Sequence, residues 1–396
     1  MPAVSPLARR VLLITVYLLG VFFFFEGVSR AVLSVRSFRH RVENDNDSSW
    51  RLRWVRRQNR MRRLYYTFDE HSPTRGWAVK ANARDLPAFS NGATVNTNSE
   101  GVRGQREYAN PKPPGITRIL VFGDSFTFGD EVSDDETYAA QLERMLPGTE
   151  VVNLGVHGYG HDQMLLYLEE VGARYQPDVV LLGFVFIDMT RNLLGFRDFA
   201  KPRFDVQGDH LVLRNTPVSS PTAVRAWEPF RLKFADLLTL LYFDWRWPSG
   251  PPLAARARVT AAILDEFRRT ATALGATPVL AYLPIEAEIA TPEIPMFAEE
   301  QFFLQYSRER ATRSVDLRPS FLAEGGKGVQ LETVGHWGPR EHQIAAEAIA
   351  TYLLDGGLAP RTGPLSTRSR ERAPAGARPE DGLSAMPPTG PRVAGG

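Results

Sequence analysis

A short apolar segment that runs into a Gly-Asp-Ser turn constrains the fold of this chain more than any other feature. Residues 118–122 (Arg-Ile-Leu-Val-Phe) have strand character, residues 123–129 read Gly-Asp-Ser-Phe-Thr-Phe-Gly, and residues 138–146 have helical apolar spacing. A serine placed where a buried strand turns toward a helix lies at the sheet edge at which α/β proteins bind ligands. Ser125 is therefore a candidate nucleophile; a turn that serves the backbone alone is the alternative.

Strand-like and helix-like segments then alternate along the middle of the chain. Strands are predicted at 150–154, 178–185, 277–283 and 313–317, and helices at 163–175, 254–274 and 339–354. Residues 189–252 interrupt this alternation as an irregular insertion. The order predicts an α/β domain whose sheet is mostly parallel and is covered by helices.

A serine hydroxyl is a weak nucleophile and needs a base within hydrogen-bond reach. His336 is the favoured candidate among the seven histidines because it precedes Pro339, which opens the last predicted helix. That loop is expected at the same sheet edge as Ser125. His342 lies inside the helix and is expected to pack or to cap.

Three segments together resemble the sequence blocks of the GDSL/SGNH hydrolases: residues 123–129, 153–160 (Asn-Leu-Gly-Val-His-Gly-Tyr-Gly) and 335–342 (Gly-His-Trp-Gly-Pro-Arg-Glu-His). The resemblance extends over about residues 95–354. It implies a three-layer α/β/α sandwich with a mostly parallel, flavodoxin-like sheet. It also implies that Ser125 is the nucleophile, that His336 is the general base, and that the N–H groups of Ser125 and Gly155 hold the oxyanion.

The sequence departs from the family pattern at two supporting positions. Ile187 stands where the family has an asparagine that donates to the oxyanion, so this donor is missing unless Asn192 replaces it. Thr333, next to Glu332, stands where an aspartate orients the base. Losing one oxyanion donor costs about a hundredfold to a thousandfold in rate.

The resemblance leaves three functions open. The first is a serine esterase or deacylase that hydrolyses an acyl ester, such as an acetyl ester, of a small molecule or a glycan. The second is an O-acyltransferase of extracellular polysaccharide, and the third is a catalytically silent module that binds a glycan or a partner. No cofactor and no metal are expected, because the chain has no cysteine, no metal-ligand spacing and no phosphate-binding loop.

The N-terminus carries the one long apolar run of the sequence. Residues 11–25 are uncharged and follow Arg9 and Arg10, but at 1.5 Å per residue they fall short of a hydrocarbon core of about 30 Å. Extension to residue 28 predicts a membrane anchor within residues 1–29 and an exported catalytic domain on the periplasmic or extracellular side. A cleaved signal peptide is the alternative.

Residues 30–94 are basic and turn-rich. The arginine run from Arg51 to Arg63 suits either anionic lipid or a solvated helix face. Nucleic acid is not an expected partner, because the net charge is only +2. Residues 355–396 are rich in Gly, Pro, Arg, Ser and Ala and are expected to be disordered.

Overall fold

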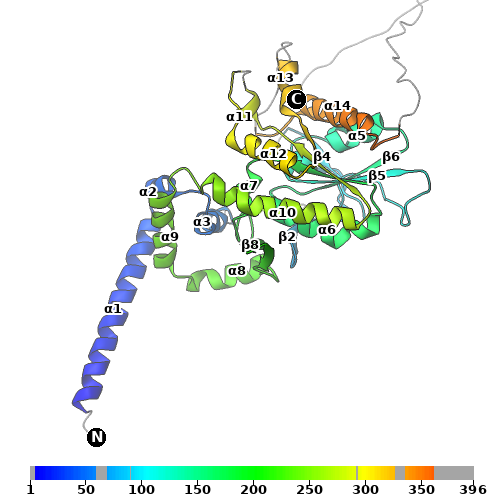
Figure 1. The fold of residues 1–396 in the computed structure, drawn as a ribbon. Helices are drawn as coiled ribbons and strands as arrows, with labels where there is room; N and C mark the ends of the chain where they lie inside the picture. The colour runs from blue at the N-terminus through cyan, green and yellow to red at the C-terminus, as the bar shows by residue number, and fades with distance from the viewer. Residues whose placement is uncertain (1–4, 59–68, 90, 291–292, 326–334, 361–396) are drawn as a thin grey trace, which may run out of the picture. The chain divides into compact units, whose positions relative to one another are not determined.

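The computed structural model describes residues 5–58, 69–89, 91–290, 293–325 and 335–360 (Figure 1). The N-terminal part begins with three helices and continues with two short antiparallel strand pairs, β1–β2 and β3–β4. Its elements are α1 (Pro6–Ser34), α2 (Arg36–Val42), α3 (Asp47–Gln58), β1 (Asp69–Ser72), β2 (Gly76–Val79), β3 (Leu86–Pro87) and β4 (Thr94–Val95).

A five-stranded parallel sheet forms the centre of the protein. Its strands occur in the order β11-β10-β7-β5-β6, which in chain order is the flavodoxin-like arrangement. The direction of winding reverses between β5 and β7, and ligands of such sheets bind beyond the strand ends at this point. The strands are β5 (Thr117–Gly123), β6 (Thr149–Gly155), β7 (Val179–Phe184), β10 (Thr277–Tyr282) and β11 (Arg313–Asp316).

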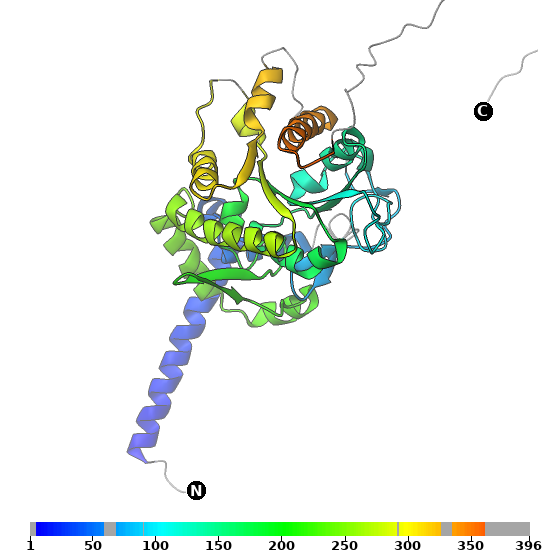
Figure 2. The ribbon, with the colours of Figure 1, turned by 45° about the vertical axis from the view of Figure 1, so that its right-hand side comes forward.

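Helices cover both faces of this sheet, and Figure 2 shows α14 and α10 on opposite sides of it. The strands are buried throughout their centres, which explains their continuous apolar sequences. The predicted α/β/α sandwich is confirmed. One face carries α6 (His161–Tyr175), α10 (Leu253–Ala273) and α12 (Ala298–Glu309), and the other carries α5 (Tyr138–Met145), α13 (Arg318–Gly325) and α14 (Pro339–Asp355).

Four short helical turns follow strands or precede helices at the edges of this sandwich. They are α4 (Ser125–Phe128), η1 (Asp134–Glu136), α7 (Asp188–Arg191) and α11 (Glu286–Ile289).

The insertion is more regular than the sequence suggested. It contains an antiparallel hairpin, whose five-residue strands are too short and too exposed for periodicity to reveal them, and a helical segment that ends in a helix of 14 residues. They are β8 (Arg203–Gln207), β9 (His210–Arg214), α8 (Pro221–Trp227), η2 (Glu228–Phe230) and α9 (Lys233–Arg246).

The N-terminal apolar run lies within one continuous helix of 29 residues, α1, with a mean hydropathy of 2.3 over its most apolar window. Within the described part of the chain it is the one helix long and apolar enough to cross a membrane. It begins before the apolar run, where Ser5 caps it and Pro6 fits its first turn. It continues beyond residue 29 to Ser34, and an ion pair of 2.8 Å joins Glu26 and Arg30 across one turn of this part.

The basic segment after α1 packs into the protein. Trp54 of α3, together with Trp77 and Val79 of β2, lies in the same apolar cluster as the central sheet. The described arginines of the run are paired with carboxylates, so they are not free cations for a lipid surface. These pairs are Arg51–Glu228, Arg53–Glu43, Arg56–Glu43 and Arg57–Asp198. Arg60, Arg62 and Arg63 lie outside the described residues, as does most of the 355–396 tail.

Candidate active site

Ser125 lies at the first position of α4, immediately beyond the carboxyl end of β5. The Oδ1 atom of Asp124 accepts the N–H of Phe126 at 3.0 Å and so caps the short helix. A Cβ atom at Gly123 would lie 1.9 Å from Oγ1 of Thr127, so only glycine permits this tight turn. The local sequence therefore places Ser125 at the winding reversal of the sheet, with 5% of its surface exposed.

His336 reaches Ser125 from the opposite end of the sequence. Its Nε2 atom lies 2.9 Å from Oγ of Ser125, although 211 positions separate the two residues. The ring of Phe126 packs beside the imidazole, with centroids 5.3 Å apart. The next residue, Trp337, is buried and donates its indole N–H to the carbonyl of Pro284 at 3.0 Å. These contacts hold the imidazole against the serine in hydrogen-bond geometry.

Two carboxylates that sequence reasoning missed lie near this imidazole, one at each ring nitrogen. An oxygen of Glu131 is 3.8 Å from Nδ1 of His336, and an oxygen of Asp130 is 3.8 Å from Nε2. Burial raises the pKa of Asp130, and the neighbouring side chains of His157 and Arg103 oppose that rise. The run of acidic residues after the Gly-Asp-Ser turn is the one sequence signal that could have indicated them.

The backbone of Glu131 is also unusual, with a φ of 71°. Residues other than glycine rarely adopt this left-handed conformation, and such strain is often retained where a side chain serves the site. Glu332 and Thr333, the base-orienting candidates from the sequence, lie outside the described residues. Within the described residues, the carboxylate of Glu131 lies at ion-pair distance from Nδ1, 3.8 Å, which is longer than a hydrogen bond.

The structure corrects the expectation for Gly155. Its N–H donates to Oδ1 of Asn153 at 3.0 Å, and the same asparagine donates to the carbonyl of Thr127 at 2.8 Å. A Cβ atom at Gly155 would lie 2.3 Å from the backbone nitrogen of Phe128. Glycine is required here because β6 and α4 approach closely, and its N–H already has an acceptor.

Asn192 is also corrected, because its side chain is fully buried and used elsewhere. Its amide nitrogen donates to Oγ1 of Thr260 at 2.9 Å and lies 3.1 Å from Nδ1 of His161. Its amide oxygen accepts the N–H of Asp162 at 3.2 Å. Burial lowers the pKa of His161 to about 3, so its neutral ring can accept a hydrogen bond. Asn192 therefore cross-links α6, α7 and α10 and offers no donor to an oxyanion.

The backbone N–H groups without an acceptor at this sheet edge include two on the loops that follow β5 and β6. Within the described residues, the N–H groups of Ser125 and Gly158 have no hydrogen-bond acceptor. Ser125 follows β5 and Gly158, with a φ of 74°, follows the adjacent strand β6. Sequence reasoning chose Gly155 from the same glycine-rich segment, in which position alone does not distinguish a donor from a packing residue.

Behind the serine, a buried charge cluster fixes the loops that follow β5 and β7. Nη1 of Arg191 donates to Asp124 at 2.9 Å, to the carbonyl of Tyr159 at 2.9 Å, and to Asp188. Burial raises the pKa of Asp188 well above its ordinary value, and the charge of Asp124 adds to the rise. The preceding residue, Ile187, is half-buried against the apolar cluster that includes α5 and α14. It carries no polar atom to replace the missing donor.

His342 adopts the structural role expected for it. It is buried in α14, and its Nδ1 atom accepts the N–H of Tyr138 at 3.1 Å at the start of α5. Burial lowers its pKa to about 3, so the ring stays neutral. Over the described ranges, no group of three or more His, Asp or Glu side chains could hold a metal ion.

No family model and no curated protein matches the chain. Several solved structures resemble it. A member of the lipolytic protein G-D-S-L family from Veillonella parvula DSM 2008 is 14% identical, with 64% of this chain and 100% of that chain covered and a TM-score of 0.36. LAE5, an α/β hydrolase enzyme from the metagenome of Lake Arreo, is 14% identical, with 65% of this chain and 100% of that chain covered and a TM-score of 0.39.

An acetyl-xylooligosaccharide esterase from Geobacillus is 16% identical, with 65% of this chain and 100% of that chain covered and a TM-score of 0.37. Because these identities and TM-scores are low, the likenesses carry no argument about activity. That argument depends on the side chains at the end of β5.

Proposed function

We propose that this protein is a serine-dependent ester hydrolase of the SGNH kind. The observation that carries the proposal is the 2.9 Å contact between Oγ of Ser125 and Nε2 of His336 at the winding reversal of a parallel sheet. A nucleophile within hydrogen-bond reach of a base that is itself held in place is the signature of covalent acyl transfer. The substrate class is an acyl ester, such as an acetyl ester of a carbohydrate.

The reaction would follow two steps. Oγ of Ser125 attacks the acyl carbon while its proton passes to Nε2 of His336, and the tetrahedral intermediate collapses as the imidazolium protonates the departing alcohol. Water, deprotonated by His336, then attacks the acyl-serine and releases the acid. The N–H groups of Ser125 and Gly158 are the donors we assign to the oxyanion. An acyltransferase would use the same acyl-serine, with a sugar hydroxyl in place of water.

The apolar side chain at position 187 is an argument for an alternative in which the protein is not an enzyme. A domain that lacks the side-chain oxyanion donor fits a silent module that binds a glycan or a partner. The close pairing of Ser125 with His336 favours the enzyme instead, because a binding module needs no aligned serine and imidazole. Labelling of the purified protein with a fluorophosphonate distinguishes the two, since the probe reacts only with an activated serine.

The same proposal includes the cellular placement. We assign α1 as a retained membrane anchor and the hydrolase domain, about residues 95–354, to the exported side. Support comes from the length and apolar character of α1, whose residues 6–20 are all exposed. Residues 30–94 would connect α1 to this domain while packing against it through Trp54 and Trp77, and the chain packs with the domain core as far as Ala359.

Glu131 is proposed as a positioning residue for His336, because its carboxylate lies nearest Nδ1. Glu131→Gln is expected to lower kcat about ten- to a hundredfold with KM unchanged, as the imidazolium loses its acidic partner. Glu131→Gly should lower kcat equally while raising the melting temperature, because glycine accepts the φ of 71° without strain. Steady-state kinetics and thermal unfolding of both variants check this.

Asp135→Asn is the matched control, since Asp135 is an exposed carboxylate of the same acidic loop. It should leave kcat unchanged. If both Glu131 variants retain wild-type kcat while Glu332→Gln or Thr333→Ala lowers it, the base is oriented by the segment before His336, and Glu131 has no such role.

Ile187→Asn is expected to increase ester turnover about ten- to a hundredfold. An oxyanion donor is worth about 3 to 4 kcal/mol in aligned sites, and an added side chain would recover part of that. The measurement is kcat on a short-chain acyl ester, with Ile187→Val as the control that keeps the position apolar. Because the amide of Asn192 is already bonded, Asn192→Ala should lower stability instead. A wild-type rate in Ile187→Asn would mean that residue 187 does not face the oxyanion.

A further inference from the structure

The helix α1 does not end where its apolar run ends; it docks onto the insertion. The carboxylate of Glu26, which is 8% exposed, accepts the N–H groups of Lys233 and Phe234 at 3.0 Å each and so caps the start of α9. Arg30 pairs with Glu26 and donates to the carbonyls of Pro229 and Arg231 at 3.2 Å. The start of α9 is thereby fixed at the level where the apolar part of α1 stops.

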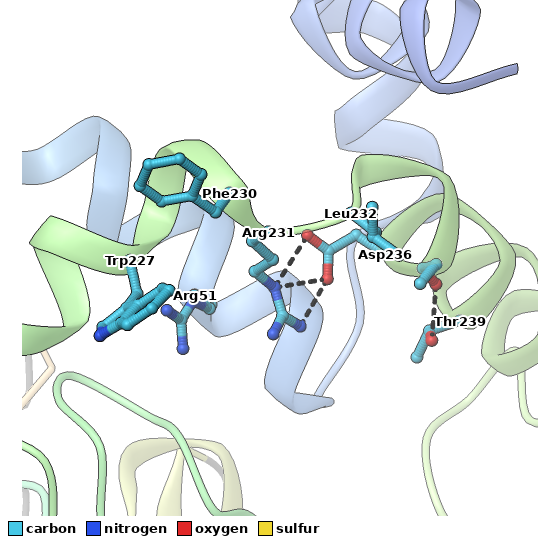
Figure 3. A pocket seen from close by; sticks show the side chains of 8 residues that line it. Arg51, Trp227, Phe230, Arg231, Leu232, Asp236 and Thr239 are labelled. Carbon is cyan, nitrogen blue, oxygen red and sulfur yellow. Dashed lines mark hydrogen bonds and ion pairs between the residues drawn. The ribbon is translucent and has the colours of Figure 1, made fainter. Parts of the chain in front are cut away.

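Beside this junction lies a pocket of about 460 Å³ with an open apolar rim (Figure 3). Trp227 and Phe230, from the end of α8 and from η2, are 70% and 73% exposed, and their rings are in edge-to-face contact at 5.8 Å. Figure 3 shows the Arg231–Asp236 ion pair beside them. Large aromatic side chains this exposed, on a segment tied to the anchor, need an apolar neighbour.

The helix α9 continues this surface with an apolar face turned outward. Leu238, Leu241, Tyr242 and Trp245 are 50%, 41%, 50% and 77% exposed and lie at helical spacing on one face. On another face, Leu240 is buried with Leu33 of α1. A helix that is apolar on its solvent side as well as its packed side is unusual for a protein surface in water.

We propose that this surface rests in the headgroup and upper acyl region of the bilayer beside α1. The membrane-facing patch consists of Trp227, Phe230, Leu232, Leu238, Leu241, Tyr242 and Trp245. A bilayer is the favoured occupant because the patch is continuous with the anchor at Glu26 and Arg30, and because Trp and Tyr concentrate at membrane interfaces. This inference rests on the membrane anchoring proposed above.

The patch also accounts for the short apolar run. Fifteen uncharged residues span only about 22 Å, but the next charged residue, Glu26, has its oxygens occupied by α9 and Arg30. Protein contacts thus replace water at the point where α1 would otherwise need it. With two attachments, α1 and the patch, the hydrolase domain would be held close to the membrane in one orientation.

The absence of cysteine from the chain allows a direct test with the full-length protein. Single cysteines at Phe230→Cys and Trp245→Cys would carry an environment-sensitive fluorophore in phosphatidylethanolamine/phosphatidylglycerol vesicles. One quencher is a nitroxide on the lipid acyl chain near the carbonyl, and the other is aqueous iodide on both sides. Val16→Cys, within α1, is the control for lipid, and Met296→Cys, an apolar residue 39% exposed before α12, is the control for water.

The expected result is that labels at 230 and 245 are quenched by the lipid nitroxide as at 16, and are several-fold less accessible to iodide than the label at 296. Iodide quenching at 230 and 245 equal to that at 296, with residue 16 still in lipid, would overturn the patch and leave the anchor intact. If the labels at 230 and 245 were shielded from both quenchers, protein would cover this surface, and the proposed membrane contact would also be wrong. A label at 16 that is open to iodide would refute the anchor itself.

Discussion

Ser125→Ala is expected to abolish both fluorophosphonate labelling and ester turnover, with a loss of at least about a thousandfold in kcat. When a nucleophile and its base act as a unit, removal of the nucleophile lowers kcat nearly as much as removal of all the catalytic residues together. The hydroxyl is small, and within the described residues its hydrogen-bond partner is His336, so the fold should persist. His336→Ala should give a loss of similar size, and the double variant should lose little more.

The control for labelling is Ser219→Ala, which removes an exposed serine between β9 and α8 and should leave labelling unchanged. Circular dichroism of each variant checks that the fold is retained. Labelling that persists in Ser125→Ala would place the reactive serine elsewhere. Wild-type protein that neither reacts with the probe nor hydrolyses short acyl esters would favour the binding module.

Arg191→Met is expected to lower the free energy of unfolding by about 3 to 5 kcal/mol. The guanidinium lies between the fully buried carboxylates of Asp124 and Asp188, and breaking a buried ion pair leaves an uncompensated charge. Ester turnover should fall as well, because Asp124 caps the helix that begins with Ser125. Denaturant unfolding in detergent, followed by tryptophan fluorescence, measures the loss.

The loss should be larger at high pH than at low pH. Burial already raises the pKa of Asp188, and removal of Arg191 would raise it further in the folded state. A carboxyl group whose pKa is higher in the folded than in the unfolded state binds more protons when the protein is folded. The free energy of unfolding therefore falls as the pH rises from the unfolded pKa to the folded pKa. The control is Arg214→Met, because Arg214 forms an exposed pair with Asp205 at 3.1 Å that is worth about 1 kcal/mol or less. Equal losses in both variants would refute a buried role for Arg191.

The nucleophile and the base could be predicted because short stretches of consecutive residues identify both of them. Gly123, Asp124 and Ser125 specify a strand, a tight turn and a helix start within a few residues, because each step depends on neighbours in sequence. His336 was identified in the same way, from its place before the helix that opens with Pro339. Since all strands of a parallel sheet end at one edge, these two local signals were enough to predict that the side chains meet.

The supporting residues could not be predicted, because their partners come from distant parts of the chain. Whether Asn192 donates to an oxyanion depends on Thr260 and His161, which lie 68 and 31 positions away. The sequence predicted that the N–H of Gly155 donates to the oxyanion. The close approach of the Phe128 backbone to Gly155, which explains the glycine instead, is visible only in the folded chain. Glu131 lies in an acidic loop that reads as solvated, and only the folded chain brings it to His336.

The sequence by itself determined the α/β class, the anchor-like helix and the serine–histidine pair, because periodicity, turn chemistry and helix starts are properties of consecutive residues. The tertiary structure alone decided which N–H groups are free, which carboxylate faces the base and which face of α9 stays exposed. The physical reason is that hydrogen-bond satisfaction and burial depend on what packs against a group, and in this fold those neighbours are separated by tens to hundreds of residues.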